Sequence, residues 1–178
     1  PGLSAATDST VTAAATPLPE TPSIDWDALQ ALGPHPRLVL ETNRGTVTIA
    51  LDTEQAPQTT QAITQLAQEG RYDGVPFHRV VPNFVVQGGD FARRDGFGGP
   101  GFFLRTEATR IGHRRGTIGM ASAGTDTEGS QFFVSHSMQP HLDGSYTAFG
   151  RVTDGMDVVD RLRAFDRIES ARVEATDE

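Results

Sequence analysis

The chain has 178 residues and a formal net charge of −8, so it lacks the basic surface that nucleic-acid binding requires. It has no cysteine, and all 15 of its Lys and Arg positions are arginine, which excludes thiol chemistry, disulfides, cysteine-ligated metals, Schiff bases and the lysine of a P-loop. No apolar run reaches the roughly 20 residues of a membrane span, and the length suits one domain with a substantial core.

Residues 1–22 consist mostly of Ala, Thr, Pro and Ser, without helical or strand periodicity. Such a segment cannot bury enough apolar surface to offset the entropy lost on ordering, so we predict a disordered linker. It resembles a tether behind a removed export signal or lipid anchor, and we expect an extracytoplasmic location, in the periplasm or cell envelope. A trimmed cytoplasmic tail is the alternative.

Residues 23–36 are expected to form a short helix and connector that begins at an N-capping Ser23 and stops at Gly33-Pro34. We expect Trp26 to pack on the domain. Apolar alternation between residues 37 and 51 predicts two strands around a turn at 42–45.

Residues 56–70 have a helical pattern, with Pro57 in the first turn and Gly70 at the end. Several short strands broken by glycine-rich loops follow, then a second helical pattern from Gly155 and a closing strand near 171–175. Many short strands with two helices indicate a mainly β fold, a closed antiparallel barrel capped by helices, over residues 37–178.

Three possible sites are rejected. The sequence "GFGGPG" at 96–101 matches the dinucleotide-binding pattern, but no strand precedes it and no helix follows. The five histidines lack metal-ligand spacing, and no nucleophile turn surrounds Ser135-His136. Paired carboxylates for glycoside hydrolysis stay open, although no pair stands out.

Residues 131–135 are more informative. By strand periodicity Phe132 and Val134 share one face and can enter a core, whereas Gln131 and Phe133 share the other. In "FHRVVPNFVVQGGD" the same period puts Phe77 and Arg79 on one face, with Gln87 nearby. These strands could line one shallow groove with apolar and hydrogen-bonding groups. Core packing with solvated polar ends is the alternative.

Five segments, in order and spacing, resemble the cyclophilin family of peptidyl-prolyl isomerases: "YDGVPFHRVVPNFVVQGGD", "GFGGPG", "GTIGMASAGTDTEGSQFFVS", "LDGSYTAFGRV" and "GMDVVDRL". The resemblance covers the chain from about Arg37 onward. It implies an eight-stranded antiparallel β-barrel capped by two α-helices, with an outer groove that binds proline-containing peptides and unfolded proteins and isomerises X-Pro bonds without metal or cofactor.

The resemblance also implies the site residues. The catalytic set is Arg79, Phe84, Gln87 and Phe133, with Arg79 over the prolyl nitrogen and Phe133 against the proline ring. The substrate-binding set is Val85, Gly96, Met120, Ala121, Ser122, Ala123, Gln131, His141, Leu142 and Tyr146.

Two departures concern ligand preference. His141 stands where many eukaryotic cyclophilins carry a tryptophan that helps to bind cyclosporin, so we expect weak cyclosporin binding. Tyr146 replaces a histidine of those proteins, an exchange familiar in bacterial members. The catalytic set is intact.

Two functions of other classes stay open. A non-catalytic proline-peptide-binding or holdase module would keep the groove without turnover. A carbohydrate-binding barrel would need an open lumen, which the apolar Phe132 and Val134 face disfavours. Nothing in the sequence signals an oligomer, and we expect a monomer.

Overall fold

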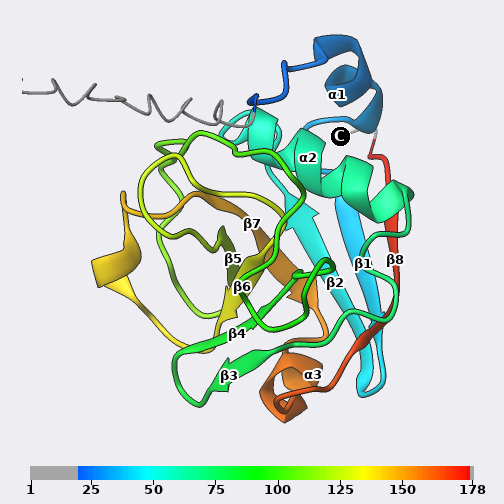
Figure 1. Ribbon diagram of the computed structural model, residues 1–178, viewed down its shortest axis with the longest axis vertical. Coiled ribbons are helices and arrows are strands. Elements are labelled where there is room, and N and C mark those ends of the chain that lie inside the picture. The colour runs from blue at the N-terminus through cyan, green and yellow to red at the C-terminus, as the bar shows by residue number, and fades with distance from the viewer. Residues whose placement is uncertain (1–19, 177–178) are drawn as a thin grey trace, which may run out of the picture.

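The computed structural model describes residues 20–176 (Figure 1). All but the last three residues of the predicted linker, 1–22, lie outside the described residues. Eight strands form one antiparallel sheet in the order β3-β4-β6-β5-β7-β2-β1-β8. The strands are β1 (Arg37–Thr42), β2 (Gly45–Leu51), β3 (Arg79–Val81), β4 (Val85–Gly88), β5 (Thr117–Met120), β6 (Phe132–Ser135), β7 (Ala148–Asp154) and β8 (Ile168–Glu174).

The sheet curls until the chain just before β3 meets the chain just before β8. Ile168 donates its N–H to the carbonyl of Val75 at 2.9 Å, and Phe77 donates to the carbonyl of Asp166 at 2.7 Å. A single bridge, Pro76 with Arg167, joins the two segments. The predicted eight-stranded antiparallel fold is thus confirmed, but these short segments, rather than a full ladder between the edge strands, span the gap.

Side chains fill the interior of the barrel. The core includes Leu38, Ile49, Phe132 and Phe149, each 0 % exposed. Val134 lies in the same core, as its alternation with Phe133 predicts. A packed interior leaves no open lumen, so the carbohydrate-binding alternative is wrong in its structural premise.

Two helices cover opposite ends of the barrel, α2 (Pro57–Gln68) and α3 (Met156–Arg161) (Figure 1). Both contribute to the core, α2 through Ile63 and Leu66 and α3 through Val159. They are the two capping helices that the sequence predicts. Among residues 20–176 no helix combines the length and the apolar character needed to cross a membrane.

The predicted short helix is α1 (Trp26–Leu32), which packs outside α2 (Figure 1). Its N-cap is Asp25, whose carboxylate accepts the N–H of Ala28 at 3.0 Å, and not Ser23, whose carbonyl accepts from Gln61 instead. Trp26 is 63 % exposed, so the expectation that it packs on the domain is wrong. Leu29 is the buried contact of this helix.

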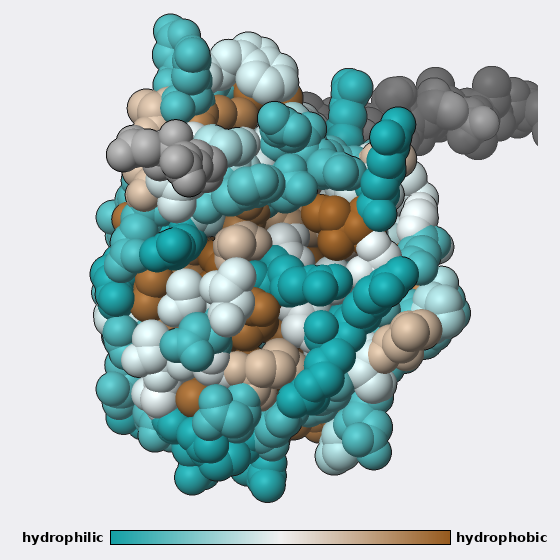
Figure 2. Space-filling view, turned by 180° about the vertical axis from the view of Figure 1, so that it is seen from behind, coloured by the Kyte–Doolittle hydropathy of each residue, from teal (hydrophilic) through white to brown (hydrophobic). Residues whose placement is uncertain are grey.

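The face seen from behind Figure 1 is mainly hydrophilic (Figure 2). Brown apolar side chains reach this surface in separate small areas, each bordered by teal polar or charged side chains. This face therefore has no broad apolar patch of the kind that marks many protein interfaces.

Candidate functional site

Four residues from four neighbouring strands lie in one row across the sheet. Arg79 of β3 pairs with Gln87 of β4, which pairs in turn with Phe133 of β6. Gly119 of β5 completes the row opposite Phe133. Directly paired residues of an antiparallel sheet project from the same face. The adjacent row, which includes Val86, lies in the core, so the Arg79 row faces outward.

On this outer face lies a cavity of about 120 Å³, which we call the Phe133 pocket. A small apolar cluster of Val85, Phe133 and Leu142 is separate from the barrel core. The full lining consists of Arg79, Phe84, Val85, Gln87, Ala121, Ser122, Phe133, Leu142 and Tyr146. Every lining residue belongs to the predicted catalytic or substrate-binding set.

Two aromatic rings hold Phe133 in place. His113 stacks on it with ring centroids 5.6 Å apart, and Tyr146 meets it edge-on at 5.9 Å. Gly119 leaves room for both rings, since a Cβ there would lie 2.7 Å from Phe133 and 2.8 Å from His113. No sequence pattern pointed to His113 and Gly119, which support the pocket without lining it.

His113 is itself fixed by Asp143, which accepts from the backbone N–H at 2.7 Å and contacts Nδ1 at 3.1 Å. Burial lowers the pKa of His113, although the bond to Asp143 acts in the opposite direction. The ring behind Phe133 is therefore neutral near pH 7.

Arg79 is tolerated in an otherwise apolar stretch because it lies exposed at the beginning of β3. Its Nη1 donates to Oε1 of Gln87 at 3.2 Å, and its guanidinium carbon lies 5.6 Å from the centre of the Phe84 ring. The alternate residue Val80 packs against the core. The exposed guanidinium is thus held at the mouth of the Phe133 pocket.

The amide of Gln131 is bonded within the protein. Its Nε2 donates to the carbonyls of Gly96 at 2.9 Å and Gly98 at 2.8 Å, and its Oε1 accepts from Nε2 of Gln87 at 3.1 Å. Both amide hydrogens are committed, so Gln131 orients Gln87 and the glycine-rich loop and has no free N–H for a ligand.

A second, larger cavity of about 590 Å³, the glycine-loop pocket, adjoins the first and shares Gln87, Ala121 and Ser122 with it. Residues 96–103 form one wall, and residues 121–123, 127 and 129–131 form the rest. The predicted residues Gly96, Ala123 and Gln131 line it. The remaining glycines and the exposed rings of Phe97 and Phe103 were not predicted, because only Gly96 of this segment was assigned to the groove.

Three expectations need correction. The Met120 side chain is 0 % exposed within the core, because β5 turns Gly119 outward and Met120 inward. His141 lines neither pocket and stacks on Phe84 at 5.9 Å, at the rim. Phe77 lies in the barrel core and does not share the face of Arg79, because β3 begins only at Arg79 and the chain before it is irregular.

Within residues 20–176, no three His, Cys, Asp or Glu side chains lie close enough together to hold a metal ion. The residues of the two pockets carry amides, aromatic rings, hydroxyls, apolar side chains and one guanidinium, besides several glycines. These groups suit recognition of a peptide with an apolar ring.

Comparison with known proteins agrees with this geometry. The family described as cyclophilin type peptidyl-prolyl cis-trans isomerase/CLD matches residues 37–177. A peptidyl-prolyl cis-trans isomerase of Synechococcus elongatus is 44 % identical over 137 residues, which cover 76 % of this chain and 94 % of that protein. Peptidyl-prolyl cis-trans isomerase B of Bacillus subtilis is 46 % identical over 123 residues, covering 68 % and 85 %.

Solved structures agree as well. A cyclophilin-type peptidyl-prolyl cis-trans isomerase of Cryptosporidium parvum matches with a TM-score of 0.74 at 27 % identity, over 80 % of this chain and 99 % of that one. The same protein crystallised in the presence of the dipeptide Ala-Pro matches with a TM-score of 0.69 at 28 % identity and the same coverage. The chain belongs to the cyclophilin family of peptidyl-prolyl cis-trans isomerases.

Proposed function

We propose that this chain accelerates rotation about X-Pro bonds in peptides and unfolded proteins, with Arg79 stabilising the twisted amide. The observation that carries this assignment is the position of the Arg79 guanidinium at the mouth of the Phe133 pocket, braced by Gln87 and Phe84. A proline ring in that pocket would place its nitrogen beneath the guanidinium.

The chemistry needs only such a donor. An X-Pro amide resists rotation because the nitrogen lone pair is delocalised into the carbonyl, with a barrier of about 18–20 kcal/mol. At the twisted transition state this delocalisation is lost and the nitrogen becomes a hydrogen-bond acceptor. A guanidinium directed at that nitrogen therefore binds the transition state better than either ground state.

The magnitudes are compatible with this arrangement. Spontaneous exchange takes roughly 10–100 s, so an ordinary turnover of roughly 10–10³ s⁻¹ requires a barrier lower by about 3–7 kcal/mol. One preorganised donor is worth about 3–4 kcal/mol. Fixing the proline ring on Phe133, beside Leu142, supplies the remainder by orientation.

The shape of the groove supports a broad substrate range. Ala-Pro is the dipeptide with which the related Cryptosporidium protein was crystallised, and a 120 Å³ pocket suits one proline ring. Unfolded proteins with accessible X-Pro bonds are accordingly the proposed substrates, and the protein is proposed to act as a monomer.

Two further proposals concern the cell and the drug. The composition of residues 1–22 supports an extracytoplasmic location, and fractionation of the source cells with an antibody to the domain would test it against a cytoplasmic one. Weak cyclosporin binding is supported by His141, which stacks on Phe84 and supplies no indole at the rim.

The decisive experiment is two-dimensional exchange NMR on an Ala-Pro peptide with catalytic amounts of protein. Arg79→Ala should lower kcat/KM by about 100-fold or more, since a lost transition-state donor costs two to three decades. Arg79→Lys keeps the charge but not the fork and should be intermediate. Arg151→Ala removes an exposed arginine of β7 that lines neither pocket, and it should behave as wild type.

The outcomes separate isomerase from binding module. Exchange peaks with the wild type and Arg151→Ala, but not with Arg79→Ala, would establish catalysis through Arg79. Peptide shifts without exchange for the wild type would favour the non-catalytic holdase instead. Nearly full activity of Arg79→Ala would refute the role given to that residue.

A further inference from the structure

We propose that Asp90, which lines neither pocket, is a positioning residue for the isomerase reaction. Its buried carboxylate fixes the glycine-rich loop and, through Gln131 and Gln87, sets the orientation of Arg79. The inference rests on the proposed role of Arg79 and extends it to a residue remote from the substrate.

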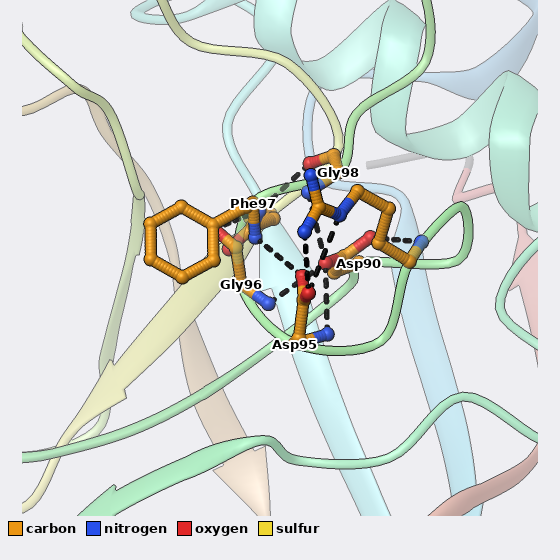
Figure 3. A network of polar contacts seen from close by, with 7 residues as sticks. Asp90, Asp95, Gly96, Phe97 and Gly98 are labelled. Atoms are coloured by element: carbon orange, nitrogen blue, oxygen red, sulfur yellow. Dashed lines mark hydrogen bonds and ion pairs between the residues drawn. The ribbon is translucent and has the colours of Figure 1, made fainter.

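The Asp90 carboxylate is 0 % exposed and is satisfied by backbone N–H groups of one loop. Oδ1 accepts from Arg93 at 2.9 Å, while Oδ2 accepts from Asp95 at 3.2 Å, Gly96 at 2.8 Å and Gly98 at 3.0 Å. Figure 3 shows these groups turned toward the carboxylate, with the Phe97 ring pointing away. One carboxylate therefore gathers four backbone N–H groups of the loop, while Asp95 accepts from the N–H of Phe97 at 3.0 Å and pairs with Arg93.

The balance of forces keeps Asp90 ionised. Burial raises the pKa of this carboxyl, but the bonds from Arg93, Gly98 and Gly96 outweigh burial and bring the pKa to about 2. Hydrogen bonds to an ionised acceptor are roughly twice as strong as neutral ones. Gly98 has no room for a side chain, since a Cβ there would meet Asp90 itself.

Two backbone carbonyls connect the loop to the groove and fix the orientation of a groove amide. Gly96 and Gly98, whose N–H groups Asp90 holds, both accept from Nε2 of Gln131. An amide is nearly symmetrical in shape but has donors on one end and an acceptor on the other. Two carbonyls at one end therefore dictate that Oε1 of Gln131 faces Gln87.

The orientation of the Gln131 amide in turn determines how Gln87 holds the Arg79 guanidinium. With Oε1 of Gln131 toward it, Gln87 must present Nε2 to Gln131 at 3.1 Å, which leaves Oε1 toward Arg79 at 3.2 Å. Reversal of the Gln87 amide would set its N–H groups against those of Arg79, and reversal of the Gln131 amide would set its N–H groups against those of Gln87. The orientation that holds the guanidinium over the pocket thus depends on the loop carbonyls, and these depend on Asp90.

Loss of the carboxylate should release this chain of contacts. Residues 96, 98 and 99 are glycines, whose backbone is conformationally free unless it is held. Without Asp90 the carbonyls of Gly96 and Gly98 lose their fixed positions, and the amides of Gln131 and Gln87 can reverse. The apolar side chains of the Phe133 pocket, Val85, Phe133 and Leu142, are not part of this chain of contacts, so peptide binding should survive while turnover falls.

The test compares Asp90→Ala and Asp90→Asn with the matched control Asp166→Ala. Asp166 is also buried, at 7 % exposure, and organises a loop by accepting from the backbone N–H of Arg163 at 2.7 Å and from side chains. It lines neither pocket. Peptide exchange rates, peptide affinity and the side-chain amide NMR signals of Gln87 and Gln131 are measured for each.

For Asp90→Ala we expect kcat to fall by about 10- to 100-fold, because small misplacement of a catalytic group has effects of this size. Peptide Kd should change by less than about threefold, and both glutamine signals should shift or broaden. Asp90→Asn retains one acceptor oxygen and should fall in between. Asp166→Ala should lose stability but keep wild-type kcat and glutamine signals. If Asp90→Ala does not fold, Asp90→Asn decides.

Three results would overturn the proposal: unchanged kcat in a folded Asp90 variant, lower kcat with unmoved glutamine signals, or an equal loss of kcat in Asp166→Ala. An inactive wild type would instead refute the proposed function. The glutamine signals would then still report whether Asp90 orients the two amides.

Discussion

The two pockets of the groove share three residues but are constructed in different ways. The Phe133 pocket is a set of side chains on β4, β6 and the segment 142–146, held by apolar and aromatic packing. The glycine-loop pocket has a glycine-rich wall, residues 96–103, whose backbone is held by hydrogen bonds to Asp90 and Gln131.

The difference predicts different responses to mutation. A packed wall loses stability when volume is removed, because the surroundings collapse only partly. A backbone wall loses its geometry when a buried acceptor is removed, because each freed N–H group loses its partner. In the proposed mechanism, packing secures the position of the proline ring, whereas hydrogen bonds that lead back to Asp90 secure the position of the Arg79 donor.

The largest effect on stability is expected from Phe133→Ala, which breaks the packed wall. Phe133 is 5 % exposed and contacts His113 and Tyr146, so its truncation should cost about 3–5 kcal/mol of unfolding free energy. Peptide affinity should weaken together with turnover. Urea unfolding and NMR titration measure both quantities, with Phe133→Leu as a control that keeps most of the apolar volume. Unchanged peptide affinity would place the proline ring elsewhere.

A smaller effect on stability is expected from Glu128, a buried carboxyl beside the glycine-loop pocket. Glu128 is 0 % exposed between two residues that line the glycine-loop pocket. Its Oε1 accepts from the N–H of Thr147 at 3.1 Å, and within the described part of the chain Oε2 has no partner. Burial raises the pKa of Glu128 to about 7, from an ordinary value of 4.5. The folded state therefore holds this proton at pH values where the unfolded chain has released it.

The raised pKa of Glu128 determines how the free energy of unfolding changes with pH. Between pH 4.5 and about 7 the folded state binds more protons at Glu128, so stability should fall as pH rises through this window, by at most on the order of 3 kcal/mol. Burial lowers the pKa of His113, and its contribution rises with pH instead. Urea unfolding of wild type and Glu128→Gln from pH 4.5 to 8 separates the two, since the variant keeps His113. A constant difference between the two curves would contradict the prediction.

The smallest effect on stability is expected at Phe97, whose side chain lies on the solvent side of the glycine-rich wall. This ring is 82 % exposed on the backbone wall, beneath the guanidinium of Arg93 at 5.8 Å. Phe97→Ser should change the unfolding free energy by no more than about 0.5 kcal/mol. It should weaken peptides with an apolar residue before the Ala-Pro unit more than it weakens Ala-Pro alone, as competition titrations would reveal. Equal weakening of both would show that the ring does not contact that part of a substrate.

Residue pattern predicted the packed wall well and the backbone wall poorly. Period-2 alternation correctly separated Phe132 and Val134 from Phe133, because a regular strand alternates its faces. The same rule failed for Phe77, which precedes β3 and enters the core from an irregular segment. The resemblance placed Met120 in the groove, but strand alternation turns its side chain into the core.

The sequence by itself determined the antiparallel strands, the two capping helices, the family and the outward set of Arg79, Gln87 and Phe133. These follow from local periodicity and from motifs whose spacing is read along the chain. Only the tertiary structure decided that Asp90 accepts hydrogen bonds from the glycine loop, that His113 supports Phe133, and that Gln131 donates its amide hydrogens to carbonyls of the protein itself. The contacts of Gln131 and His113 join residues far apart in sequence and depend on distances that appear only when the sheet has curled. The contacts of Asp90 lie within eight positions of it, but in an irregular loop that periodicity does not predict.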